Sequence, residues 1–168
     1  MLNLQDNNIN IKEYIKLEDY KSFDYEIPNI SLDFIIEDTR VIVKTELILL
    51  KKNLNTNILI LDGVDIFVEE IYLNDAILHP QNYSIHKNRL IIKSILKEKF
   101  SIKINGIINP KKNISLIGMY ESNGIITTQC EAEGFRRISY HSDRPDVLSK
   151  YKVRIEANKE DYPVLLSN

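Results

Sequence analysis

The amino-acid sequence predicts an all-β fold: an antiparallel β-sandwich, or a pair of saddle-shaped sheets, in a single domain. Two observations predict it. Between residues 29 and 106, apolar and polar side chains alternate in short runs, as they do in strands with one buried face. Turn-forming residues separate these runs, and the one segment that suggests a helix, residues 94–99, is too short to change the fold class.

The first two predicted strands show the clearest alternation. In residues 29–36, the side chains of Ile30, Leu32 and Phe34 share one face, with polar residues between most of them. A short turn leads into a second strand over residues 41–50, in which an apolar inner face and a charged outer face alternate again. Both strands are therefore expected to have one buried side.

The other predicted strands are shorter and end at turn residues. Asp62 and Gly63 close one of them, and we expect a turn there because glycine adopts positive φ angles freely. These strands span residues 58–61, 66–73, 83–85, 89–92 and 100–106, and the third and fourth of them form a hairpin.

The beginning of the chain has a different texture. Residues 1–28 are polar with scattered aromatic residues, and we expect an irregular extension there, followed by the β domain over residues 29–168. We expect no signal peptide, because no basic stretch precedes an apolar core, and no membrane helix, because no apolar run approaches the roughly 18 residues needed. These features predict a cytoplasmic location.

Composition excludes several classes of function. The formal net charge is −2, from 22 basic and 24 acidic residues, which lacks the basic excess of a nucleic-acid-binding surface. The single cysteine excludes a disulfide framework and a zinc site of several thiolates. His79 and His86 are seven positions apart in a β region, so they cannot share one helix face around a metal. We therefore expect no metal ligands in this chain.

Residues 128–137 concentrate the functional groups, and they read TQCEAEGFRR. If this segment is extended, Gln129, Glu131 and Glu133 project to one face, because side chains alternate along a strand. Cys130 then points to the other face, where a small buried apolar residue is expected rather than a redox thiol. A functional rim and a solvated surface loop both fit this pattern.

The sequence resembles the amino-terminal domain of the bacterial aminopeptidase N family of gluzincin zinc metallopeptidases. Four segments carry the resemblance: LIGMYESNG at 116–124, TQCEAEGFRRISY at 128–140, DRPDVLSKY at 143–151 and KEDYPVLLSN at 159–168. The main departure from the family is at residues 140–142, where an aromatic residue followed by leucine is more usual.

The resemblance implies a β-saddle that covers a separate catalytic domain, which would carry the H-E-x-x-H motif and the zinc of the parent enzyme. It also implies that the chain is only the first domain of that enzyme and is inactive alone. By the same resemblance, Glu131 holds the free amino group of the peptide substrate, and Gln129 is a neighbouring contact. A carboxylate suits this role, since a charge-assisted hydrogen bond contributes about 1.5–3 kcal/mol.

Other polar residues of this region have structural interpretations. Glu133 is expected to pair with Arg136 or Arg137, and the two arginines to hold the loop or a domain interface rather than to touch substrate. Residues 143–146 are expected to form a turn, since proline fixes φ and aspartate caps. The alternative function is a free-standing β-sandwich that binds a protein partner; a downstream H-E-x-x-H motif in the reading frame would distinguish the two.

Overall fold

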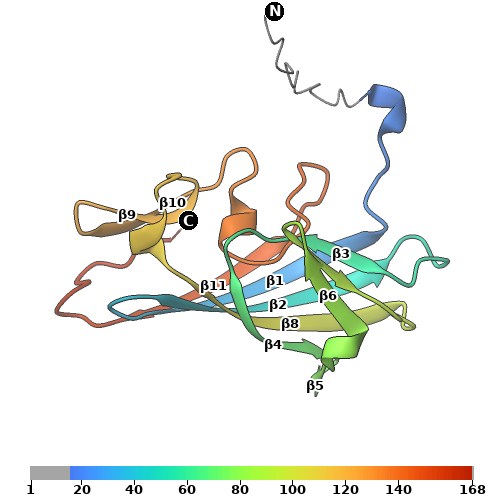
Figure 1. Ribbon diagram of the computed structural model, residues 1–168, viewed down its shortest axis with the longest axis horizontal. Coiled ribbons are helices and arrows are strands. Elements are labelled where there is room, and N and C mark those ends of the chain that lie inside the picture. Colours follow the sequence, from blue (N-terminus) through green and yellow to red (C-terminus); the bar gives the residue numbers. More distant parts are fainter. Residues whose placement is uncertain (1–15, 168) are drawn as a thin grey trace, which may run out of the picture.

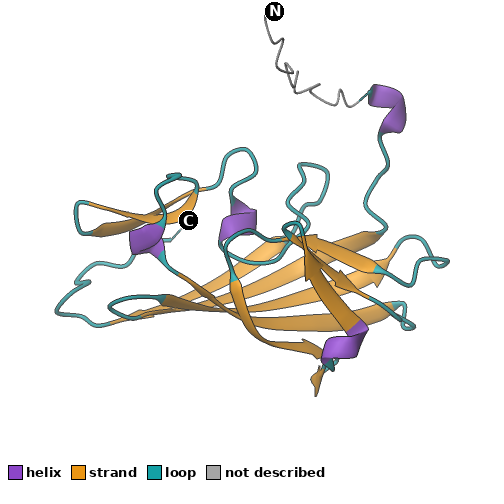
Figure 2. Cartoon of the chain, viewed as in Figure 1, coloured by secondary structure: helices purple, strands orange, loops and turns teal. Residues whose placement is uncertain are grey.

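The computed structural model describes residues 16–167 and confirms the all-β prediction (Figures 1 and 2). Its largest element is a six-stranded sheet. In spatial order, the strands are β11 (Lys150–Ala157), β1 (Tyr25–Ile36), β2 (Val41–Lys51), β8 (Lys99–Ile108), β4 (Phe67–Leu73) and β5 (Ala76–Ile77). Neighbours are antiparallel except β1 and β11, which are parallel.

Two smaller sheets complete the described part of the chain. One has the order β3 (Leu59–Asp62), β7 (Arg89–Ile92) and β6 (Tyr83–His86), and the other is a hairpin of β9 (Gly118–Ser122) and β10 (Ile125–Gln129). Short 3-10 helices lie between strands: η1 (Leu17–Asp19), η2 (Pro80–Asn82), η3 (Pro110–Lys112) and η4 (Phe135–Arg137). The predicted hairpin of residues 83–85 and 89–92 is confirmed as β6 and β7.

The core is built from the alternating residues that the sequence indicated. Leu32 and Phe34 of β1 are buried beside Val43 and Leu47 of β2, with Phe34 opposite Val43 in the register. The same alternation operates in β3, where Leu61 is fully buried and Ile60, one position away, is 42% exposed. The buried faces of the six- and three-stranded sheets join in one apolar cluster.

The first strand begins earlier than predicted. β1 starts at Tyr25, so residues 25–28 belong to the sheet and the predicted irregular extension is too long at its end. A register shift between Glu26 and Asn29 accommodates Pro28, which has no N–H to donate to a ladder. The buried Tyr25 donates its hydroxyl proton to the carbonyl oxygen of Ile58 at 2.8 Å. The expectation for residues 1–15 lies outside the described residues.

Two local predictions are corrected. Residues 94–99 form no helical turn; Ile95 there is buried, and its amide donates to the carbonyl of Asn57. Gly63 is required for a different reason than the one predicted. The positive φ of this turn belongs to Asp65, whereas a Cβ atom on Gly63 would lie 2.3 Å from the ring of Tyr140. Glycine is needed because an aromatic ring occupies the space of a side chain.

The burial of β2 yields a stability prediction. Leu47 is completely buried at the centre of the sheet, so Leu47→Ala removes buried methyl groups and leaves a cavity. We expect a loss of about 2–5 kcal/mol in the free energy of unfolding, measured by chemical denaturation. Leu54→Ala is the matched control, because Leu54 is 62% exposed, and it should change stability by less than about 0.5 kcal/mol. Equal losses in both variants would contradict this account of the core.

Candidate functional site

The site residues follow the β9–β10 hairpin. Gln129 is the last residue of β10 and pairs with Gly118 of β9, and its side chain is exposed. Glu131 lies two residues further on and is also exposed. In Figure 1 this hairpin and helix η4 lie together on one side of the six-stranded sheet. The sheet therefore acts as a base from which the candidate site projects.

The prediction that the segment stays extended through Glu133 is wrong. The strand ends at Gln129, and residues 131–134 form a turn that the amide of Gly134 closes by donating to the carbonyl of Cys130 at 2.8 Å. Gly134 is packed tightly: an added Cβ would lie 2.6 Å from the carbonyl oxygen of Gln129. Gln129, Glu131 and Glu133 are therefore not successive side chains on one strand face.

The charges of this turn are not equivalent. Glu133 pairs with Arg136 at 3.4 Å, as the sequence suggested, and Arg137 pairs with Asp65. Within residues 16–167, the Glu131 carboxylate has no hydrogen bond or ion pair with any other group. Glu131 is thus an exposed carboxylate beside charged neighbours that already have partners, which leaves it available to a cation from outside the domain.

A buried carboxylate holds the chain that follows the turn. Asp143 accepts hydrogen bonds at Oδ2 from the backbone amide of Arg136 at 3.1 Å and from its Nε at 2.9 Å. The Nη2 of Arg136 also donates to the carbonyl oxygen of Asp143 at 3.0 Å. The predicted turn after Asp143 is confirmed, with the amide of Val147 donating to the carbonyl of Arg144 and an ion pair between Arg144 and Asp146.

The segment after the turn is fixed to both larger sheets. Asp62, at the end of β3, exchanges two backbone hydrogen bonds with His141, of 2.7 and 3.0 Å. The hydroxyls of Thr45 and Ser139 are 2.5 Å apart and both residues are buried. These contacts give the candidate site a rigid support.

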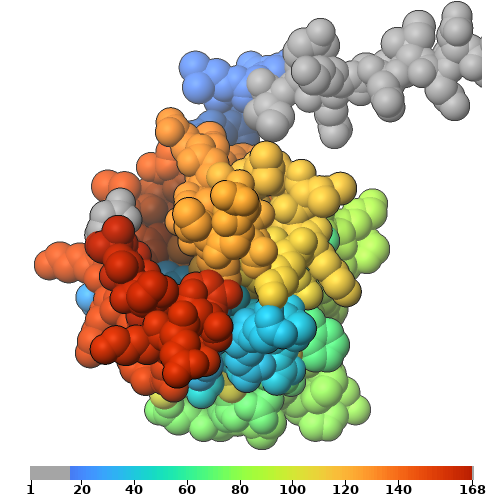
Figure 3. Space-filling view, turned by 90° about the vertical axis from the view of Figure 1, so that its left-hand side faces the viewer, coloured from blue at the N-terminus to red at the C-terminus, as the bar shows by residue number. Residues whose placement is uncertain are grey.

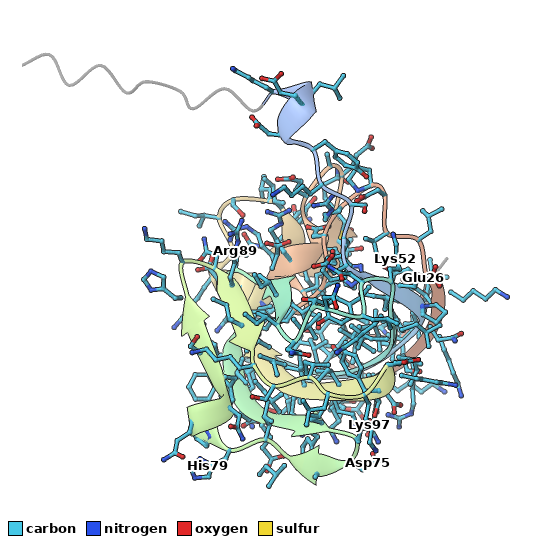
Figure 4. The ribbon with its side chains drawn as sticks, turned by 90° about the vertical axis from the view of Figure 1, so that its right-hand side faces the viewer. Glu26, Lys52, Asp75, His79, Arg89 and Lys97 are labelled. Atoms are coloured by element: carbon cyan, nitrogen blue, oxygen red, sulfur yellow. The ribbon has the colours of Figure 1, made fainter. Side chains whose placement is uncertain are left out.

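Cys130 and His141 have structural roles. Cys130 is half-buried and packs against the core, as predicted, and burial raises the pKa of its thiol. His141 is buried against Phe135, whose ring centroid is 5.2 Å away, and burial lowers the pKa of the imidazole to about 4. Figure 4 shows His79 projecting outward, at the end of the molecule away from η4.

The described residues do not fit a metal ion. Within residues 16–167, no group of three or more His, Cys, Asp or Glu side chains is arranged to hold one. A zinc ion bound by protein needs at least three such ligands. No helix among these residues is long and apolar enough to cross a membrane.

An apolar groove of about 750 Å³ opens beside the candidate site. The hairpin, the β1–β11 edge of the large sheet and residues 161–167 line it. In Figure 3 the red C-terminal residues lie on the same face as the yellow and orange residues of the hairpin and the turn. Several apolar side chains around it are exposed, among them Ile125 at 67% and Leu166 at 86%.

The sequence profile of the Peptidase M1 N-terminal domain matches residues 25–168, which is nearly the whole chain. The chain belongs to this family. It is 37% identical over 150 residues to aminopeptidase N of Escherichia coli K12, and 38% identical over 154 residues to aminopeptidase N of Caulobacter vibrioides. These alignments cover 89% and 92% of this chain but only 17% and 18% of the relatives, so the chain spans less than a fifth of their length.

Solved structures of the M1 family share the fold. Legionella pneumophila aminopeptidase A, solved with aspartic acid, is 40% identical, with a TM-score of 0.84 over 92% of this chain and 18% of that protein. An M1 zinc metallopeptidase of Deinococcus radiodurans is only 12% identical, with a TM-score of 0.67 over 80% of this chain and 33% of that one. The second likeness concerns the fold alone. The family profile, the aminopeptidase N relatives and the Legionella structure confirm the family resemblance read from the sequence.

Burial of His141 yields a pH prediction. Its pKa is about 4 in the folded protein against 6.5 for an unperturbed histidine, so the unfolded chain binds the extra proton first as the pH falls. The stability contributed by neutral His141 is present above pH 6.5 and is lost between pH 6.5 and 4, up to about 3 kcal/mol. Its Nδ1 has no hydrogen-bond partner among the described residues, so His141→Phe sacrifices no bond there.

The test compares chemical denaturation of wild type and His141→Phe at several pH values between 7 and 3. Wild type should lose more stability than the variant over this range, and the difference should level off below pH 4. His79→Asn, at an exposed position, is the control and should keep the wild-type pH dependence. Identical pH dependence in wild type and His141→Phe would contradict the prediction.

Proposed function

We propose that this chain is the amino-terminal domain of a zinc aminopeptidase, and that Glu131 binds the free amino group of the peptide substrate, with Gln129 as a neighbouring contact. One observation carries the proposal: Glu131 is exposed and unpaired within residues 16–167, while Glu133 is held by Arg136. The family match supports the parent enzyme class, because the relatives that contain this domain are aminopeptidases.

The chemistry of the reaction explains why such a carboxylate is useful. An aminopeptidase must place the first residue of a peptide at its reactive centre and reject internal positions. A fixed carboxylate that pairs with the terminal ammonium sets this register by positioning. The pair becomes stronger once a second domain covers the site and excludes water, because the local dielectric falls.

We propose that the catalytic domain of the same protein is the partner of this domain and covers the candidate site. Exposed apolar side chains on the hairpin and on residues 161–167 support this, since contiguous apolar surface marks an interaction site. The zinc of the parent enzyme is assigned to that second domain, because the residues described here do not fit it. We also propose a cytoplasmic location for the parent enzyme.

The alternative, a free-standing interaction module, can be distinguished from this proposal by the gene sequence downstream of residue 168. If the gene continues beyond Asn168 into an H-E-x-x-H motif, the domain belongs to a metallopeptidase. If the gene carries no such motif, the module hypothesis replaces the proposed function.

Glu131→Gln tests the amine-binding role in the complete enzyme. The substitution preserves shape and removes the charge, so one charge-assisted hydrogen bond to the substrate is weakened. We expect kcat/KM to fall by about ten- to a hundredfold, from a loss of about 1.5–3 kcal/mol. The measurement is steady-state kinetics on an amino-acid anilide, with zinc content and Tm unchanged because Glu131 contacts neither a metal nor the core.

Glu133→Gln is the matched control, because it is the same substitution two residues away on a carboxylate that already has a partner. It should leave kcat/KM within about threefold of wild type. Gln129→Ala should fall between the two variants, since it removes a neutral contact. If kcat/KM falls strongly in Glu133→Gln and is unchanged in Glu131→Gln, the amine-binding role has been assigned to the wrong carboxylate.

The isolated chain gives a metal prediction. Purified residues 1–168, dialysed against a zinc-containing and then a zinc-free buffer, should retain no stoichiometric zinc and should release no product from an aminoacyl anilide. The complete enzyme should retain zinc and should release the anilide product. Metal analysis by mass spectrometry and the anilide assay measure this, and zinc at one per chain with chelator-sensitive turnover would overturn it.

A further inference from the structure

We propose that Asp143 and Arg136 are positioning residues that set the location of Glu131 without touching substrate. This inference rests on the proposed function of Glu131 and extends it to two residues that do not contact its carboxylate. The structure connects them to it through a continuous series of short contacts, each of which fixes the next part of the chain.

The series begins at an ion pair whose carboxylate, that of Asp143, is buried. Asp143 is only 9% exposed, and its Oδ2 receives both the amide and the Nε of Arg136, while Nη2 of Arg136 reaches the Asp143 carbonyl. Three hydrogen bonds to one residue, two of them from a planar guanidinium, fix direction as well as distance. Helix η4 (Phe135–Arg137) is therefore held to residue 143 by both main-chain and side-chain groups.

Arg136 then passes this restraint to the turn. Its Nη2 also lies 3.4 Å from Oε1 of Glu133, but that side chain is 66% exposed, so the ion pair adds little and the backbone carries the restraint. The carbonyl of Gly134, the last residue of the turn, accepts from the amide of Arg137 at 3.0 Å. Since the amide of Gly134 in turn bonds to the carbonyl of Cys130, the turn that carries Glu131 is attached at both of its ends.

The same arginine is attached to the body of the domain. The carbonyl of Arg136 accepts from the amide of Val64 at 2.7 Å, and the guanidinium of Arg137 pairs with Asp65. Both partners lie in the loop between β3 and β4. The paired residues Arg136 and Asp143 thus connect the β3–β4 loop to the turn. An exposed side chain keeps a defined position only when its supporting residues are fixed in this way.

Loss of the hydrogen bonds between Arg136 and Asp143 should displace the Glu131 side chain, although Glu131 itself is unchanged. Asp143→Asn takes away the negative charge but leaves an oxygen of similar position, so the half-buried Arg136 loses the nearer of its two carboxylate partners. A displaced turn would misplace the substrate ammonium, and a misplacement of about 1 Å can cost up to a hundredfold in rate. We expect kcat/KM to fall by about tenfold in the complete enzyme, with KM and kcat affected in the same proportion as in Glu131→Gln.

The decisive measurement is a double-mutant cycle on an amino-acid anilide. If Asp143 acts through Glu131, then adding Asp143→Asn to Glu131→Gln should cause little further loss in kcat/KM. A residue that only stabilises the fold would lower both backgrounds equally. Arg136→Lys is the second variant, because lysine keeps the positive charge but lacks the planar guanidinium that makes two hydrogen bonds to Asp143. If Asp143→Asn does not fold, Arg136→Lys should show the same non-additivity with Glu131→Gln.

Arg154→Lys is the matched control. Arg154 also bridges two carboxylates, Asp33 and Glu156, but it does so on the exposed face of β1 and β11, and its substitution should leave kcat/KM unchanged. Two results would overturn the positioning role while the proposed function stands. One is a double variant in which the losses in kcat/KM multiply. The other is full activity of Asp143→Asn and Arg136→Lys when Glu131→Gln has lost activity. Full activity of Glu131→Gln would overturn both.

Discussion

The architecture depends on the way in which β1 is paired on both of its edges. Its antiparallel partner, β2, follows it directly in the chain, whereas its parallel partner, β11, comes after every other strand. A parallel pair requires a long connection between its strands. Here that connection includes the hairpin, the turn with Glu131 and the segment up to Tyr140 and Asp143. The site therefore lies on an excursion that leaves the six-stranded sheet at the end of β8 and returns to it at β11.

This arrangement explains how an exposed carboxylate can be held in place without contacts of its own. Glu131 gains its position from its neighbours: the closed turn, the pairing of Arg136 with Asp143, and the backbone bonds of the following segment to Asp62 and Val64. The charged groups around Glu131 pair with one another, and within residues 16–167 none of them pairs with the Glu131 carboxylate. A binding group that is held by the backbone on both sides keeps its full charge for a ligand, whereas one held by its own side chain would not.

Much of the fold could be predicted from the sequence because one-sided burial imposes a period of two. Ile30, Leu32 and Phe34 show that period, and the structure buries all three. β11 could not be found this way, because it is an edge strand whose side chains are mostly exposed or half-exposed. The pairing of Glu133 with Arg136 was foreseen, but the turn that separates Glu131 from it was not. That turn depends on the close packing of Gly134 against Gln129, a tertiary constraint without a local periodic signal.

Gly63 illustrates how such packing affects the interpretation of genetic data. Its only special property is that the ring of Tyr140 occupies the volume where a side chain would stand. Any replacement would push that ring, and with it the adjacent backbone pair between Asp62 and His141, out of place. In a saturation screen for folded protein, position 63 would therefore tolerate few replacements, although it carries no functional side chain. Intolerance to substitution in this family can thus report on the scaffold beneath a site as readily as on the site itself.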